Sequence, residues 1–258
     1  MLAGFDKFSE VMRNHHEQFV VIGGTACEAA LEDTGIARRA TRDIDMVVII
    51  EQLSAEFIAQ LWHFFQDGGY KASRRTNRSG RSVYAFYRFE HPTKDDYPAK
   101  IEILARKAEY MFGVDEEARI EPIVDDEALY SLSAIIMDDD IYQFTIQHWE
   151  EYRGVRMASP TALVCLKARA YLNLLQDRAA GKRVNTEDIK KHRRDVLMLL
   201  ATGKVEDTVV PMSIYQTLQD FISAMRELPL SDLAKSLGVT DVVINEYLEV
   251  LSTTFTIE

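Results

Sequence analysis

The sequence predicts an α+β fold, in which a mixed β-sheet with flanking helices is followed by a helical C-terminal half. In the first part of the chain, short apolar runs of the kind found in buried strands alternate with amphipathic helical segments. After Pro160 the pattern changes to long stretches of helical periodicity. We therefore expect two domains, residues 1–155 and 156–258.

Each expected element follows from its own residues. Apolar or β-branched runs predict strands at 19–22, 43–50, 82–89 and 100–104. Helical spacing of apolar residues predicts helices at 5–17, 25–31, 54–67, 160–177, 186–201 and 211–226, with a pair across 230–252. The polar segment from His91 to Pro98 allows the strands on either side of it to form a hairpin. Short strands and turns are expected at 119–137.

The composition indicates a globular protein without membrane spans. Of its 258 residues 47% are hydrophobic and 28% charged, and no apolar run reaches the roughly 18 residues of a membrane helix. The segment from Met1 to Lys7 lacks the basic and apolar parts of a secretory signal. Cys27 and Cys165 lie in apolar stretches and are expected to be buried free thiols. We therefore expect a reducing, cytoplasmic setting.

The net charge of −11 argues against a broad DNA-binding surface, because such a surface is basic. Basic residues nevertheless cluster at 38–42, 74–81 and 190–194. Solvated faces would explain these clusters, and so would a local phosphate-binding pocket.

A glycine turn stands where the first predicted strand meets the next helix. Gly23, Gly24 and Thr25 follow Ile22 directly. Glycines at such a turn let backbone N–H groups approach a phosphate closely, and the helix N-terminus adds a favourable dipole. Gly-Gly turns are common, so this turn alone is a weak signal of phosphate binding.

Acidic residues interrupt two of the apolar strands. Asp43 and Asp45 lie two apart, so their side chains share one face of the strand while Ile44 points to the other. Two such carboxylates repel each other unless a cation lies between them, which is compatible with a Mg²⁺ site. A strand end with two solvated acids explains the pair equally well. Glu102, inside the strand 100–104, needs a partner or a metal if buried. A solvent-facing edge strand would also explain it, since Lys100 shares its face.

The order of these features resembles the nucleotidyltransferase superfamily, which combines a Gly-Gly turn, an Asp-x-Asp pair and a third carboxylate. A closer resemblance is carried by two segments, Gly23-Gly-Thr-Ala26 and Arg39-Ala-Thr-Arg-Asp43-Ile-Asp45. They are similar to the AbiEii/AbiGii-type nucleotidyltransferases, which are toxins of type IV toxin–antitoxin systems. The resemblance covers most of residues 18–200.

The resemblance implies a set of site residues. The triphosphate of an NTP would be held by Gly23, Gly24 and Thr25, and two Mg²⁺ ions by Asp43, Asp45 and Glu102. Lys167, as a catalytic residue, would neutralise the charge of the triphosphate. Arg39 would orient Asp43 or contact phosphate, and Lys191 and His192 would bind the nucleotide. Arg178 and Asp195 are further counterparts of family positions. A surface lysine is the alternative for Lys167, and a solvated helix face for residues 190–194. Two positions depart from the family pattern, because Glu102 and His192 stand where members often carry aspartate.

We therefore expect a Mg²⁺-dependent bacterial enzyme that transfers a nucleoside monophosphate from an NTP to tRNA or a protein, with a cognate antitoxin. One alternative is a small-molecule nucleotidyltransferase of the antibiotic-modifying kind, whose polyamine or sugar acceptor an acidic cleft would attract. The other is a non-catalytic module that binds nucleotide.

Overall fold

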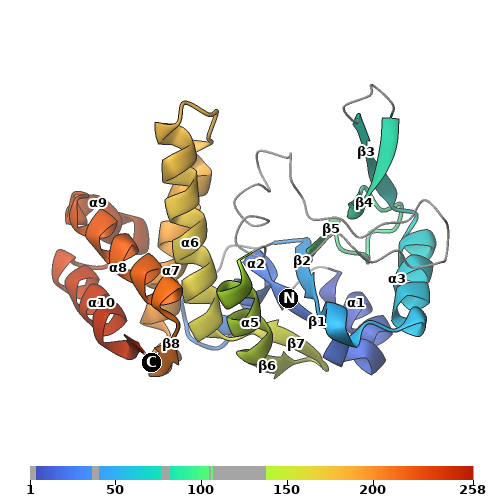
Figure 1. Ribbon diagram of the computed structural model, residues 1–258, viewed down its shortest axis with the longest axis horizontal. Coiled ribbons are helices and arrows are strands. Elements are labelled where there is room, and N and C mark those ends of the chain that lie inside the picture. The colour runs from blue at the N-terminus through green and yellow to red at the C-terminus, as the bar shows by residue number, and fades with distance from the viewer. Residues whose placement is uncertain (1–3, 37–40, 77–81, 105, 107–137, 258) are drawn as a thin grey trace. The chain divides into compact units, whose positions relative to one another are not determined.

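The computed structural model describes residues 4–36, 41–76, 82–104, 106 and 138–257. Its contacts divide the chain into two compact units, which are drawn together in Figure 1 and described separately here. The first, the sheet unit, contains the described residues of 4–29, 41–106 and 149–158. The second, the helical unit, contains 30–36, 138–148 and 159–257. The predicted domain boundary at residue 155 falls inside a strand of the sheet unit.

The sheet unit is built on a seven-stranded sheet in the order β3-β4-β5-β2-β1-β7-β6. Its strands are β1 (Phe19–Ile22), β2 (Asp43–Val48), β3 (Lys71–Thr76), β4 (Ser82–Glu90), β5 (Lys100–Leu104), β6 (Trp149–Tyr152) and β7 (Val155–Ala158). The sheet is mixed, because β2 runs antiparallel to β1 and parallel to β5. Strands β4 and β5 form the predicted antiparallel hairpin. The predicted α+β class is confirmed.

Three helical segments of the sheet unit precede its fourth strand in the chain. They are α1 (Phe5–Met12), α2 (Gly23–Ala30) and α3 (Ala55–Gly68). Short 3₁₀ turns lie between α1 and β1, at Arg13–Gln18, and between β2 and α3, at Ile50–Gln52. The predicted helix 5–17 is wrong beyond Met12, because residues 13–18 carry no apolar side chain to continue its buried face. Helix α3 is capped at both ends. The Ser54 hydroxyl accepts a hydrogen bond from the Phe57 N–H at its N-terminus, and Gly69, at φ 64°, ends the helix.

Aromatic side chains from α1, α3 and the sheet form the core of this unit. All four residues of β1 are fully buried, as a run without polar side chains predicts. Phe8 packs edge-on against both Phe19 and Phe64, with ring centroids 5.7 and 5.8 Å apart. Phe65 of α3 stacks on Phe89 of β4. This packing fixes the central strands on which the predicted acids lie.

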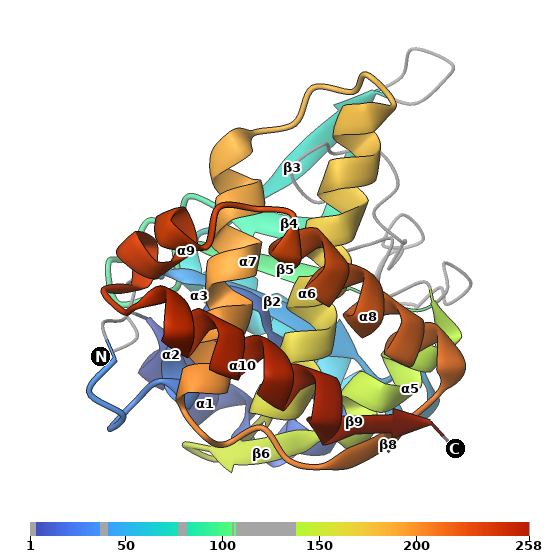
Figure 2. The same cartoon turned by 90° about the vertical axis from the view of Figure 1, so that its left-hand side faces the viewer.

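The helical unit consists mainly of α-helices and one small parallel sheet. Its elements are α5 (Asp139–Gln147), α6 (Pro160–Ala179), α7 (Thr186–Ala201), α8 (Met212–Arg226), α9 (Leu230–Leu237), α10 (Asp241–Thr254), β8 (Thr208–Val210) and β9 (Phe255–Ile257). Helix α6 packs along both α7 and α8, and α10 lies against α7 and α8 (Figure 2). Ser159 and Asn185 cap the N-termini of α6 and α7.

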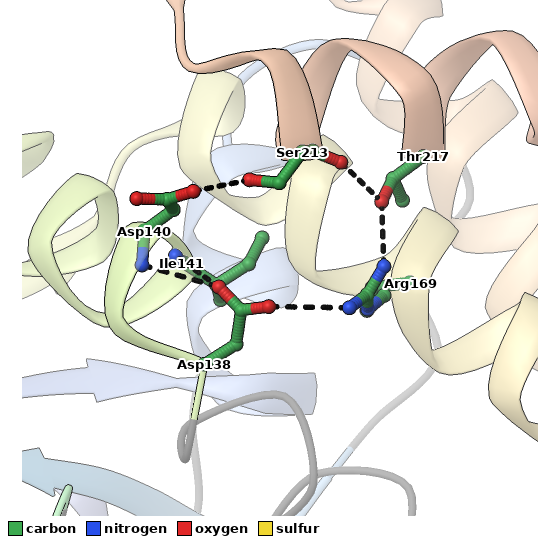
Figure 3. Close-up of polar contacts among 6 residues, drawn as sticks. All are labelled: Asp138, Asp140, Ile141, Arg169, Ser213 and Thr217. Atoms are coloured by element: carbon green, nitrogen blue, oxygen red, sulfur yellow. Dashed lines mark hydrogen bonds and ion pairs between the residues drawn. The ribbon is translucent and has the colours of Figure 1, made fainter.

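A polar network joins three helices of this unit (Figure 3). Asp138, the N-cap of α5, pairs through Oδ2 with the Arg169 guanidinium of α6 at 3.2 Å. Arg169 also donates to the Thr217 hydroxyl of α8 at 2.9 Å. Thr217 donates to the Ser213 carbonyl at 2.8 Å, and the Ser213 hydroxyl donates to Asp140. The network therefore holds the start of α5 against α6 and α8.

Several elements are absent from the sequence prediction. These are β3, α5, the β6–β7 hairpin and the β8–β9 pair. The short strands expected at 119–137 lie outside the residues that the structure describes. Among those it does describe, no helix is both long and apolar enough to span a membrane.

Candidate active site

The glycine turn brings the main chain against an acid of the neighbouring strand. Strand β1 ends at Ile22 and α2 begins at Gly23, whose φ of +74° lies in the left-handed region. Ile22 is paired with Asp45 across the sheet, so the Asp45 carboxylate lies directly over the turn. A Cβ on Gly23 would overlap Asp45 Oδ2 and lie only 2.9 Å from its Cγ. Glycine is therefore required here by both the backbone angle and the space available.

The two aspartates share one face of β2, as predicted. Ile44 between them is buried at 2% exposure, whereas the side chains of Asp43 and Asp45 are partly exposed. Strand β2 is buried from Met46 to Val48, so the acids stand where the strand emerges from the core. This arrangement leaves two carboxylates accessible beside a glycine turn and a helix N-terminus.

Side chains of α2 fix the main chain at the start of β2. The Thr25 hydroxyl donates to the Asp43 carbonyl at 2.5 Å. One turn later, the Glu28 carboxylate accepts the Thr41 N–H at 3.1 Å, and the Thr41 hydroxyl accepts the Asp43 N–H at 3.4 Å. The Asp43 carbonyl is therefore held directly by a side chain of α2. The Asp43 N–H is held by Thr41, whose own N–H is bound to Glu28 of α2. The sequence analysis missed Glu28, although an acid three residues after Thr25 in an apolar helix was a visible signal.

Glu102 is the most buried acid near this turn. Strand pairing places it opposite Asp45, and it is 2% exposed. Its Oε1 accepts a bond from Arg88 Nε at 2.6 Å, and its Oε2 lies 3.1 Å from Lys100 Nζ. Burial, with the nearby Asp45 charge, raises the pKa of Glu102 to about 7, although the two cations oppose this. The alternative of a solvent-facing edge strand is wrong, since β5 pairs with a strand on each side.

Lys100 links the buried acid to the aspartate pair. Its Nζ lies 3.5 Å from Asp43 Oδ2 as well as close to Glu102. Burial alone would lower the pKa of Lys100, but the charges of Glu102, Asp45 and Asp43 together raise it. Lys100 and Arg88 are site residues that the sequence analysis did not assign, because their contacts depend on how β4, β5 and β2 align.

The aspartates fit a Mg²⁺ ion bound together with a nucleotide. Mg²⁺ prefers oxygen ligands and is commonly held by one or two carboxylates, with phosphate oxygens and water completing its shell. Asp43 and Asp45 supply such a pair on one strand face. Both oxygens of Glu102 already face cations, and no group of three or more His, Cys, Asp or Glu among the described residues is arranged to hold a metal. Coordination by Glu102 stays a prediction.

The predicted residues of the helical unit include a buried ion pair. Lys167 of α6 is 4% exposed, and its Nζ lies 2.9 Å from Asp195 Oδ2 of α7. The alternative of a surface lysine is wrong. Buried ion pairs contribute little net stability, because desolvation offsets their attraction. The pair is therefore a candidate functional feature within α6 and α7.

The other predicted contacts differ in their surroundings. His192 is buried at 6% exposure, and Lys191 beside it is partly exposed. Lys190 fits the alternative of a solvated face, since it is exposed and pairs with Glu187. Arg178 donates to the Thr186 hydroxyl at 2.9 Å. The predicted contact Arg39 lies outside the described residues, so its role stays a prediction.

One of three comparisons with known proteins finds a match. Neither the curated proteins nor the solved structures give a match. The family model described as "Nucleotidyl transferase AbiEii toxin, Type IV TA system" matches residues 9–235, which include the glycine turn, both aspartates, Glu102 and Lys167. That match extends over most of the chain. The protein therefore belongs to the AbiEii family of nucleotidyltransferase toxins.

Proposed function

We propose that the protein transfers a nucleoside monophosphate from an NTP to a hydroxyl acceptor, with Asp43 and Asp45 holding Mg²⁺. The position of the Asp45 carboxylate over the Gly23 backbone carries this proposal. It puts the acids within reach of the same turn whose N–H groups and helix dipole attract phosphate. Family membership independently supports nucleotidyl transfer.

The chain's own residues would bind and align the reactants. Gly23 and Gly24 would let the triphosphate approach the start of α2, and Thr25 would keep Asp43 in place through its carbonyl. The acceptor oxygen then forms a bond to the α-phosphorus, the bond to the bridging oxygen breaks, and pyrophosphate and one proton leave. Mg²⁺, two ions in the arrangement we favour, supplies charge neutralisation for this in-line displacement.

The acceptor we propose is a macromolecule, tRNA or protein, and the activity that of a toxin with a cognate antitoxin. The family description, which names a toxin of a type IV system, supports the toxin activity and the antitoxin partner. Lys167, Lys191 and His192 stay predicted contacts to the nucleotide. These three residues belong to the helical unit, whereas the glycine turn and the aspartates belong to the sheet unit, so each of the three requires a test of its own.

The test is label transfer from each α-³²P-labelled NTP, with Mg²⁺, to bulk tRNA or to proteins of a cell extract. We compare the wild type with Asp45→Asn and with Asp232→Asn, which removes an equal charge from an exposed position in α9. Asp45→Asn should lower the rate by about 100-fold or more, since metal charge neutralisation is worth several kcal/mol. Asp232→Asn should transfer label normally. Wild-type transfer by a folded Asp45→Asn protein would refute the proposal.

A further inference from the structure

A positive charge already lies among the three acids of the sheet unit. Lys100 Nζ lies 3.1 Å from Glu102 Oε2 and 3.5 Å from Asp43 Oδ2. The pairing of β2 with β5 sets Asp43 opposite Lys100 and Asp45 opposite Glu102. These four side chains therefore share one face of two adjacent strands, and the ammonium contacts an acid on each strand.

The surroundings make this cation more than a surface ion pair. The Lys100 side chain is 23% exposed and Glu102 only 2%, so solvent screens their charges weakly. Arg88 contacts the other oxygen of Glu102, which leaves three acids facing two cations. Without Lys100 the acids would outnumber the cations by two, and one acid would be deeply buried. The repulsion among those acids must then be relieved by a bound cation or by protonation.

We infer that Lys100 is a built-in counter-cation, which offsets part of the negative charge of the carboxylate site in the absence of metal and competes with a divalent ion for Asp43. The inference rests on the proposed function for the identity of the site. Lys100 acts here as a positioning residue, since it touches the carboxylates rather than the reacting atoms. Glu102, held by Arg88, fixes the ammonium beside Asp43.

The inference has two consequences that activity alone would not show. A divalent ion without nucleotide should bind weakly, because it must share Asp43 with the ammonium. Removing the ammonium should therefore tighten metal binding, by about tenfold for a unit charge a few ångströms from the ion in a partly solvated site. The same removal should lower the thermal stability of the metal-free protein, and Mg²⁺ should restore it.

The experiment measures Mn²⁺ binding by electron paramagnetic resonance, without nucleotide, on the full chain. The variants are Lys100→Met, Lys100→Arg, which keeps the charge, and Lys235→Met, which removes an equal charge from an exposed position in α9. We expect Lys100→Met to bind Mn²⁺ about tenfold more tightly than the wild type. The Lys100→Arg and Lys235→Met proteins should bind as the wild type does.

Thermal unfolding in EDTA gives the second measurement. Lys100→Met should melt at a lower temperature than Lys235→Met, and added Mg²⁺ should remove most of that difference. Unchanged or weaker Mn²⁺ binding by Lys100→Met would overturn the inference, and so would equal melting of the two variants in EDTA. These failures differ from failure of the proposed function, which Asp45→Asn reports through label transfer.

Discussion

The substitution Gly23→Ala tests the close contact between the Gly23 main chain and the Asp45 carboxylate. The residue has a φ of +74°, which costs a non-glycine residue about 1–2 kcal/mol. The new Cβ would also overlap Asp45 Oδ2, so the carboxylate must leave its rotamer at a further cost of about 0.5–1.5 kcal/mol. We expect a total loss of about 1.5–3.5 kcal/mol in the free energy of unfolding.

Gly238→Ala is the matched control. Gly238 ends α9 at φ +70°, and a Cβ there would meet no atom within 4 Å. It should therefore lose only the backbone contribution of about 1–2 kcal/mol. At a temperature where both proteins are folded, Gly23→Ala should lose about 100-fold in transfer rate, because a misplacement of about 1 Å has that effect on aligned reactants. Gly238→Ala should keep the wild-type rate.

Urea unfolding and initial rates of label transfer measure the two effects. A Gly23→Ala protein with wild-type transfer would show that the Asp45 carboxylate need not stay over the turn. Equal losses of stability in the two variants would show that the contact with Asp45 is relieved without cost. Either result refutes the geometric argument for the site, whereas loss of activity in both variants would point to general unfolding.

Three more outcomes follow from the structure. Glu102 holds its proton more tightly when folded than at its ordinary pKa of 4.5, so the stability of the metal-free protein should fall by up to ~3 kcal/mol as the pH rises from 4.5 to 7. Urea unfolding of Glu102→Gln across that range should show no such fall. Lys167→Met should lower the free energy of unfolding by about 3–5 kcal/mol, because it leaves the Asp195 carboxylate without its lysine partner. The double variant Lys167→Met with Asp195→Leu should lose less. Arg169→Met should lose about 1–3 kcal/mol in the same assay, since it leaves Thr217 without its guanidinium partner, while Mn²⁺ binding stays unchanged.

Local patterns predicted much of the fold. Strands β1 and β5 and helix α7 have the predicted bounds, because each is a run whose own periodicity and flanking turn residues define it. The Gly-Gly turn and the Asp-x-Asp pair were equally local signals. The placement of Asp43 and Asp45 on one face of β2 follows from the two-residue period of a strand and needs no tertiary information.

Elements without such a pattern escaped prediction. Strand β3 has the sequence Lys71-Ala-Ser-Arg-Arg-Thr76, whose polar residues form no alternating apolar face, so only its pairing with β4 makes it a strand. The β6–β7 hairpin turns at Arg153 and Gly154, both at positive φ. Arginine is an unusual residue for that position, since such turns favour Asn-Gly or Asp-Gly. Both cases are set by tertiary contacts rather than by propensity.

The surroundings of Glu102 could not be predicted from the sequence. An isolated acid in an apolar strand requires a partner or a metal, and the residues around it cannot decide between the two. The decision depends on strand alignment: Arg88 lies on the next strand of the hairpin, and Asp45, fifty-seven positions earlier, lies opposite on β2. Lys100 was visible in the sequence as a neighbour on the same face. Only the pairing of β5 with β2 places that lysine between Asp43 and Glu102, as a cation shared by two acids.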